Sequence, residues 1–131
     1  MENEVAINYE NKIILVNKYN MPNLNDHVVE KFCITRGTPL GNPYTHNPIT
    51  IYNGNWKTES REESNIKFKI WLDERLLNGN IEIREYLNRI LKSIREGKTV
   101  FLICACAPKK CHGDYLRELL IEKLNSNEEE F

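Results

Sequence analysis

The sequence predicts an α/β fold in which helices pack on a mostly parallel sheet. Short apolar segments come early in the chain, two helical segments follow, and the last third has the order helix, strand, helix. This alternation is typical of an α/β sandwich, here one with three layers. A chain of 131 residues that is 40% hydrophobic can bury one core, so we expect a single domain over residues 1–124.

The first half of the chain contains strand signals separated by turns. Residues 4–19 predict a short hairpin or one long strand, within which 13–16 has the character of a core strand, and residues 28–34 predict a second strand. Five glycines and prolines between 37 and 48 favour a shaped loop over any regular element. An Asn-Gly turn signal predicts a small hairpin over 49–56.

Helical patterns dominate the next part of the chain. Residues 62–77 predict a helix that places Ile66, Ile70 and Leu77 on one side, with Trp71 beside them. Residues 83–94 carry apolar side chains at helical spacing and end before a glycine, which predicts an amphipathic helix.

The last third contains a strand, a polar turn and a helix. Residues 99–105 form an apolar run that predicts an inner strand covered on both faces. The final helix carries Leu116, Leu119, Leu120 and Leu124, and the acidic residues 125–131 predict a flexible tail in solvent.

Charge and hydropathy exclude several classes of partner. The 18 basic and 19 acidic side chains are mixed along the chain and give a net charge of −1, so we expect neither nucleic acid nor a membrane surface as a partner. No apolar run approaches the ~20 residues of a membrane span, and the acidic start lacks the layout of a signal peptide. We therefore expect a cytoplasmic protein.

Two unusual loops follow predicted strands, at 36–48 and at 105–114. In open parallel sheets, ligands bind outside the carboxyl ends of the strands, where such loops converge. The two loops are therefore expected to face each other across one crevice.

The turn Cys111-His112-Gly113-Asp114 precedes the last predicted helix and favours an anion site. A helix start presents free N–H groups and a partial positive charge, Gly113 would let a phosphate approach the backbone, and His112 could donate to it. Alternatively, Asp114 only caps the helix, and the neighbouring Lys109 and Lys110 face solvent.

Three of the four cysteines lie near this turn and have more than one interpretation. Cys104, Cys106, Cys111 and His112 could ligate zinc or an iron–sulfur cluster, but the spacing is poor for a structural zinc site. Cys104 and Cys106 fit one face of a packed core better than they fit a metal site, and Cys111 could be a nucleophile activated by the helix start. We assign no metal and no cofactor, and we keep a metal-stabilised interaction module as an alternative.

The loop 36–44 combines an arginine, glycines, prolines and an amide. Prolines stiffen the backbone and glycines permit unusual dihedral angles, so the loop, with Gly41, could hold Arg36 and Asn42 ready for a phosphate. The other interpretation is a rigid loop in which Arg36 pairs with a carboxylate such as that of Asp114. Arg61 either adds a second cation to the crevice or lies on the surface.

Together these motifs resemble the domain of unknown function 4326 family, which is common in phage and bacterial genomes. The resemblance covers residues 13–124 and is carried by Arg36, Pro39-Leu-Gly-Asn-Pro-Tyr44, Arg61, Trp71-Leu72, Cys104-Ala-Cys-Ala-Pro108 and Cys111-His-Gly-Asp114. The sequence departs from the family's pattern at Ala105, where a large aromatic residue is expected, and in having a longer connection around residues 53–54. The resemblance implies a Rossmann-like domain with a nucleotide-type ligand and supplies no reaction.

The leading functional hypothesis is a binder of a phosphate-bearing nucleotide or nucleotide-derived signal. Its ligand-binding residues would be Arg36, Gly41, Asn42, Arg61, Cys111, His112, Gly113 and Asp114. A phage-encoded binder of this kind, in the host cytoplasm, could sequester a host immune signal. The alternative is an enzyme on nucleotides or nucleosides, an N-glycosidase or phosphohydrolase, with His112 or Asp114 as acid or base. Small sheets of this kind often complete their burial by forming homo-oligomers.

Overall fold

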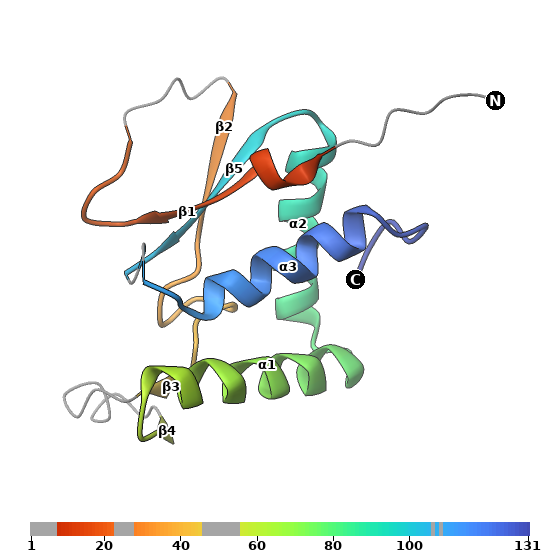
Figure 1. Cartoon of the computed structure of the whole chain (residues 1–131). Helices are drawn as coiled ribbons and strands as arrows, with labels where there is room; N and C mark the ends of the chain where they lie inside the picture. Colours follow the sequence, from red (N-terminus) through yellow and green to blue (C-terminus); the bar gives the residue numbers. More distant parts are fainter. Residues whose placement is uncertain (1–7, 23–27, 46–55, 106, 108) are drawn as a thin grey trace.

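The computed structural model of the chain describes residues 8–22, 28–45, 56–105, 107 and 109–131. The elements are η1 (Tyr9–Asn11), β1 (Ile13–Asn17), β2 (Val29–Cys33), β3 (Tyr44–Thr45), β4 (Trp56–Lys57), α1 (Arg61–Leu77), α2 (Ile81–Arg95), β5 (Thr99–Cys104) and α3 (His112–Leu124) (Figure 1). Within the described ranges, none of the helices has the length and apolar character needed to cross a membrane.

Three strands form an all-parallel sheet in the order β1-β5-β2. Hydrogen bonds continue past the strand ends, from the Lys18 N–H to the Cys104 carbonyl (2.8 Å) and from the Ile34 N–H to the Ile103 carbonyl (2.9 Å). The carboxyl ends of all three strands therefore lie at one edge of the sheet. These strands correspond to the segments predicted at 13–16, 28–34 and 99–105, and the predicted α/β class with a parallel sheet is confirmed.

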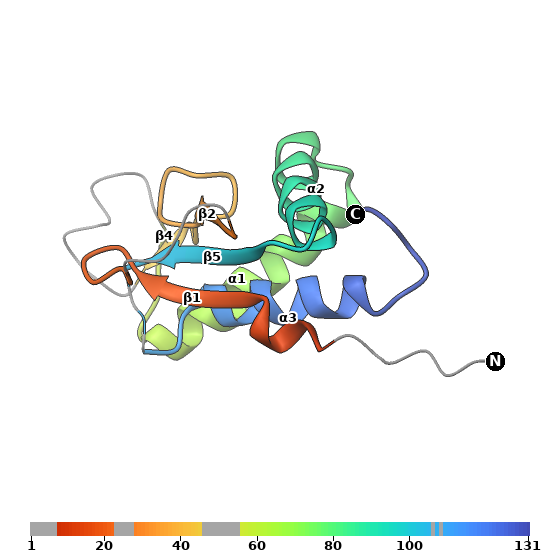
Figure 2. The ribbon, with the colours of Figure 1, turned by 90° about the horizontal axis from the view of Figure 1, so that it is seen from above.

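The buried apolar side chains form two clusters, one on each face of the sheet. All three helices contribute to the larger cluster, where Val100, Leu102 and Cys104 of β5 point. The smaller cluster takes the alternate residues Phe101 and Ile103 together with side chains from β1 and β2. The inner strand is thus buried on both faces, as its apolar run predicts. Figure 2 shows β1 and β5 side by side, with α3 running along them.

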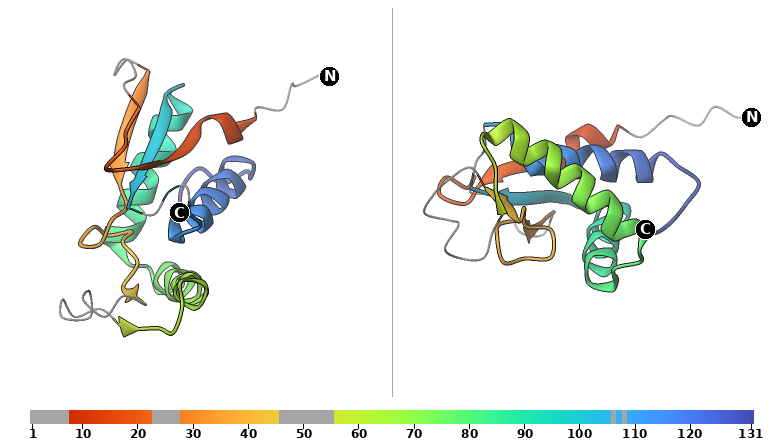
Figure 3. Two further views of the ribbon diagram at one scale, coloured as in Figure 1. Left: turned by 60° about the vertical axis from the view of Figure 1, so that its left-hand side comes forward. Right: turned by 90° about the horizontal axis from the view of Figure 1, so that it is seen from below.

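Helix α1 buries a different face from the predicted one. Its buried side chains are those of Ser64, Phe68 and Leu72, whereas Ile66 and Ile70 are each 55% exposed and Leu77 is 86% exposed. Phe68 and Leu72 are four residues apart and point the same way, and positions two residues from Phe68 point away from it. The helix lies beyond the carboxyl ends of β2 and β5 and packs against α3 (Figures 1 and 3).

Two further segments, at the N-terminus and at 49–56, were predicted to contain strands. A 3₁₀ turn at Tyr9–Asn11, capped by the Asn8 side chain, interrupts the one long strand predicted over 4–19, and residues 4–7, where the first strand of the alternative hairpin was predicted, lie outside the described residues. The predicted hairpin at 49–56 lies outside the described residues except for its last position, Trp56, which pairs with Tyr44 in a parallel bridge.

The C-terminal residues 125–131 are docked along α2 in this structure. The Phe131 N–H donates to Asn88 Oδ1 (2.8 Å), and Arg95 donates to the carbonyls of Glu128 (3.1 Å) and Glu129. The Phe131 side chain packs against the larger cluster. The flexibility predicted for this tail stays a prediction, but its residues have defined contacts here.

The two faces of α1 predict different mutational costs. Phe68→Ala should lower the free energy of unfolding by about 3–5 kcal/mol because it empties a fully buried site. Ile70→Ala should change it by less than about 0.5 kcal/mol, because that side chain faces solvent. Urea unfolding followed by circular dichroism measures both, and equal losses would contradict this assignment of the faces.

Candidate functional site

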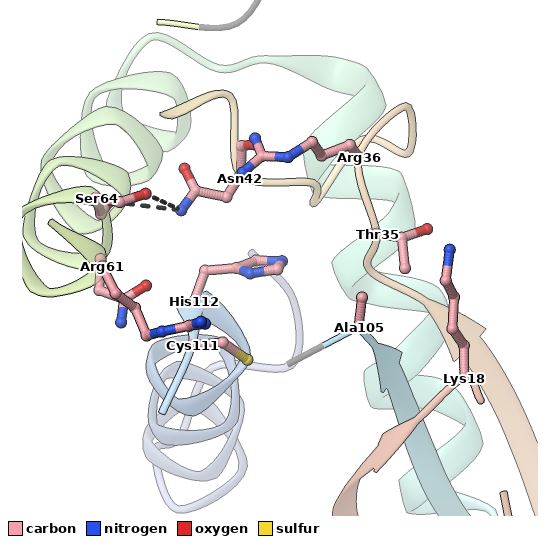
Figure 4. A pocket seen from close by; sticks show the side chains of 10 residues that line it. Lys18, Thr35, Arg36, Asn42, Arg61, Ser64, Ala105, Cys111 and His112 are labelled. Atoms are coloured by element: carbon pink, nitrogen blue, oxygen red, sulfur yellow. Dashed lines mark hydrogen bonds between the residues drawn. The ribbon is translucent and has the colours of Figure 1, made fainter. Parts of the chain in front are cut away.

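A cavity of about 250 Å³ lies at the edge of the sheet where the three strands end (Figure 4). Each strand of the sheet is followed by a lining residue, and the helices α1 and α3 both begin at the cavity. The lining residues are Lys18 after β1, Thr35 and Arg36 after β2, and Asn42 in the loop before β3. They continue with Arg61, Ser64 and Asn65 at the start of α1, Ala105 after β5, and Cys111 and His112 at the start of α3. The expected convergence of the two loops is therefore observed.

The lining is strongly cationic. It contains Lys18, Arg36 and Arg61 and no acidic side chain. Within the described ranges neither Lys18 nor Arg61 pairs with a carboxylate, although the Lys18 Nζ lies 4.9 Å from the centre of the Tyr19 ring. The amino-terminal ends of α1 and α3 add partial positive charge at the same place.

Arg36 holds its own loop together. Its Nη1 donates to the Asn42 carbonyl and its Nη2 donates to the Tyr44 carbonyl (2.8 Å). The suggested partner Asp114 instead accepts a bond from the Cys111 N–H (2.8 Å). Arg36 therefore lies at the cavity while also fixing the curvature of residues 36–44.

Asn42 attaches this loop to α1. Its Nδ2 donates to Ser64 Oγ (2.9 Å), its Oδ1 accepts from the Tyr44 N–H (2.9 Å), and Ser64 Oγ donates to the Tyr44 carbonyl (3.0 Å). Both Asn42 and Ser64 are buried. The amide that was predicted to hold a ligand is thus satisfied by the protein, and its role in the structure is to position the loop.

Gly41 is required by backbone packing. A Cβ there would lie 2.5 Å from the Thr35 carbonyl oxygen and 2.9 Å from the Arg36 Cα. Gly41 is absent from the cavity lining, and its predicted ligand contact is replaced by this close approach of two backbone segments.

His112 lines the cavity but makes a structural contact. Its Nε2 lies 2.6 Å from the Ile34 carbonyl oxygen, which can only accept, so Nε2 carries a proton. The ring packs edge-on against Phe68, with the ring centres 4.9 Å apart. Burial lowers the pKa of His112 to about 4, and the nearby Arg36 charge acts in the same direction, while the carbonyls of Ile34 and Leu40 and the charge of Asp114 oppose them. His112 is therefore neutral at pH 7, and its Nε2 is engaged by the fold.

The start of α3 is closed by a capping box. Cys111 Sγ accepts from the Gly113 N–H (3.3 Å), and the Asp114 carboxylate accepts from the Cys111 N–H. The capping interpretation of Asp114 is confirmed. A Cβ on Gly113 would lie 2.6 Å from Leu15 Cδ2 and 2.9 Å from Ile34 Cδ1. Gly113 thus allows the helix to approach the sheet, and the side chains of Leu15 in β1 and of Ile34, directly after β2, lie where a ligand was expected.

The cysteines have structural contacts in the described residues. Cys104 is 1% exposed, as the core interpretation predicts, and its Sγ accepts from the Ala107 N–H (3.4 Å). Cys106 lies outside the described residues. Among those that are described, no group of three or more histidine, cysteine or carboxylate side chains could hold a metal ion.

A comparison with models of known protein families identifies the family of this chain. The model of the family described as domain of unknown function (DUF4326) matches residues 14–122, which is most of the chain. The chain belongs to the DUF4326 family. No curated protein matches the sequence, and no solved structure does so either.

The DUF4326 chain has cavity residues that sequence reasoning missed. These are Lys18, Thr35, Ser64, Asn65 and Ala105. Lys18 and Ala105 directly follow β1 and β5, so the rule that ligands bind beyond strand ends could have identified both. Ala105 is exposed and lines the cavity at the position where the family resemblance leads one to expect an aromatic. Of the predicted ligand-binding residues, Arg36, Asn42, Arg61, Cys111 and His112 line the cavity, and Gly41, Gly113 and Asp114 do not.

The packing of Gly113 predicts a loss of stability on adding one methyl group. Gly113→Ala should lower the free energy of unfolding by about 1–3 kcal/mol, because Leu15 and Ile34 must move, although alanine is the better helix former. Glu118→Ala on the exposed side of the same helix should cost less than about 0.5 kcal/mol. Thermal unfolding compares them, and an unchanged Gly113→Ala midpoint would contradict the packing role.

The lowered pKa of His112 predicts a pH dependence of stability. The unfolded chain binds a proton near pH 6.5 and the folded chain only near 4, so acidification between these values should favour unfolding. The slope from this group is at most about 1.4 kcal/mol per pH unit. His112→Gln keeps an N–H donor but cannot titrate, so its unfolding free energy should fall less over this interval. Urea unfolding at a series of pH values gives both curves, and parallel curves would contradict the burial of a neutral His112.

Proposed function

We propose that this DUF4326 protein binds a nucleotide-type small molecule whose phosphate occupies the cavity. The observation that carries the proposal is the lining, which has three cationic side chains and no carboxylate. The whole chain has a net charge of −1, so this concentration of positive charge is a local property of the site.

The chemistry of the lining suits a phosphate in particular. Arginine presents several N–H donors in a plane that matches phosphate oxygens, and lysine adds a compact charge. Two helix starts supply further positive potential, which is a recurring feature of phosphate sites. These contributions come from different elements and meet at one cavity.

The volume of the cavity determines how much of a ligand can fit inside it. At about 250 Å³ it lies just below the ~300–1,000 Å³ of pockets that enclose a whole small molecule. A phosphate with its attached sugar is a reasonable occupant.

Binding without turnover is the form of activity that the geometry favours. The two candidate acid–base groups are both engaged, His112 with the Ile34 carbonyl and Asp114 with the Cys111 N–H. Such a binder would act by sequestering its nucleotide. Incubation with a panel of mononucleotides and cyclic dinucleotides, followed by mass spectrometry, distinguishes bound unchanged ligand from altered ligand. A chemically altered nucleotide would favour the enzyme alternative, and no retained nucleotide would overturn the proposal.

The cations predict which substitutions weaken binding. Lys18→Gln and Arg61→Gln should each reduce the affinity for the retained nucleotide about tenfold or more, because each removes a charged hydrogen-bond donor from the cavity. Lys92→Gln changes net charge equally on the exposed side of α2 and should leave the affinity unchanged. Isothermal titration calorimetry measures all three, and equal effects of Lys92→Gln and Lys18→Gln would show that only overall charge matters.

A further inference from the structure

A second hollow lies next to the cavity, in the groove between α1 and α3. Its volume is about 570 Å³, and it shares Arg61, Asn65 and Cys111 with the cavity lining. A hydrogen bond from Asn65 Nδ2 to the Lys110 carbonyl (3.4 Å) joins α1 to the segment before α3 at this boundary. Arg61, one turn earlier on α1, lines both spaces and marks the junction between them.

The groove differs from the cavity in its charge. Its charged lining comprises the carboxylates of Glu62, Asp114 and Glu118 with Arg61, Lys69 and Lys110. Three acidic groups thus face the groove, whereas the cavity has none. The charges that line the groove balance, whereas those that line the cavity are all positive, so a phosphate is favoured in the cavity, and this sets the direction in which a two-part ligand lies.

The walls of the groove also carry apolar surface. Ile66 is 55% exposed and lines it together with Tyr115. The Tyr115 hydroxyl donates to Asp73 Oδ1, and the Lys69 Nζ lies 5.3 Å from the centre of the ring, so the ring, which belongs to α3, is held against α1. A flat ring system can pack on such a wall while its polar edge meets the carboxylates.

We infer that the groove takes the base of the nucleotide whose phosphate occupies the cavity, and that the base carries an exocyclic amino group. The inference rests on the proposed function. The cavity is too small for a whole nucleotide, the adjoining groove is large enough for a base, and Glu62 and Glu118 are exposed acceptors suited to an amino donor. Arg61 lies where the sugar and phosphate of such a ligand would cross between the two spaces.

The experiment compares three probes by calorimetry: ribose 5-phosphate, inosine 5′-monophosphate and adenosine 5′-monophosphate. The first lacks a base, and the last two differ at the six-membered ring, where the adenosine nucleotide has an amino group beside an N1 acceptor and the inosine nucleotide has an oxo group beside an N1–H. Wild-type protein should bind the adenosine nucleotide about tenfold more tightly than the inosine nucleotide, and ribose 5-phosphate least tightly. Glu118→Gln should reduce the preference for the adenosine nucleotide several-fold and leave ribose 5-phosphate binding unchanged. Glu122→Gln, one turn further along α3 and outside the groove lining, should change neither.

The outcomes separate this inference from the proposed function. Equal affinities for ribose 5-phosphate and both nucleotides would overturn the base site while leaving the phosphate site standing. Equal affinities for the two nucleotides, both above that of ribose 5-phosphate, would contradict the amino-group preference. Absence of binding by all three probes would overturn the phosphate site and the base site together. All the variants replace exposed side chains, so circular dichroism should show a folded protein in each case.

Discussion

The parallel pairing of β5 with both of its neighbours is the constraint on which the rest of the structure depends. Because β1 and β2 both run in the direction of β5, all three carboxyl ends meet at one edge, and every chain segment that leaves the sheet does so there. Lys18, Arg36 and Ala105 come together for this reason, although they are far apart in the sequence. An antiparallel neighbour would carry its loop to the opposite edge and remove one wall of the cavity.

The polar groups at this edge divide into those that build the site and those that remain for a ligand. Asn42 and Ser64 use their side chains to attach the loop to α1, and His112 uses Nε2 on the Ile34 carbonyl. These groups are buried, where an unmade hydrogen bond is costly, so they hold the loops in place. Lys18 and Arg61 are more exposed and lack such bonds in the described residues, which leaves their charge directed at the cavity. Because these buried hydrogen bonds already hold the loops in place, little conformational entropy is lost when an anion binds to the neighbouring cations.

The sequence contains enough information to predict the elements and their convergence but not the role of each polar residue. The strands at β1, β2 and β5 and the helix α2 follow from apolar periodicity, and the meeting of the two loops follows from parallel topology. Helix α1 was assigned the wrong face because it carries apolar residues on two sides, and only the tertiary neighbours of Phe68 decide between them. Gly113 fits both a phosphate approach and a helix packed on a strand, and the contacts with Leu15 and Ile34 that distinguish these are remote in the sequence. Local pattern thus locates a site, whereas long-range packing determines which of its residues are free to act.

The near-neutral charge of the chain conceals an uneven distribution of charge across the site. The cavity has three cations and no carboxylate, and the adjoining groove has three carboxylates and three cations, of which Arg61 lies at the boundary. The cavity and the groove are adjacent, and at physiological salt electrostatic fields extend about 8 Å, so one small ligand would meet positive charge at one end and mixed charge at the other. A molecule with a phosphate at one end and hydrogen-bond donors at the other would be oriented by this field before any close contact forms. The composition of the whole chain, in which acidic and basic residues nearly cancel, cannot reveal such a field, because it arises only where α1, α3 and the strand ends meet.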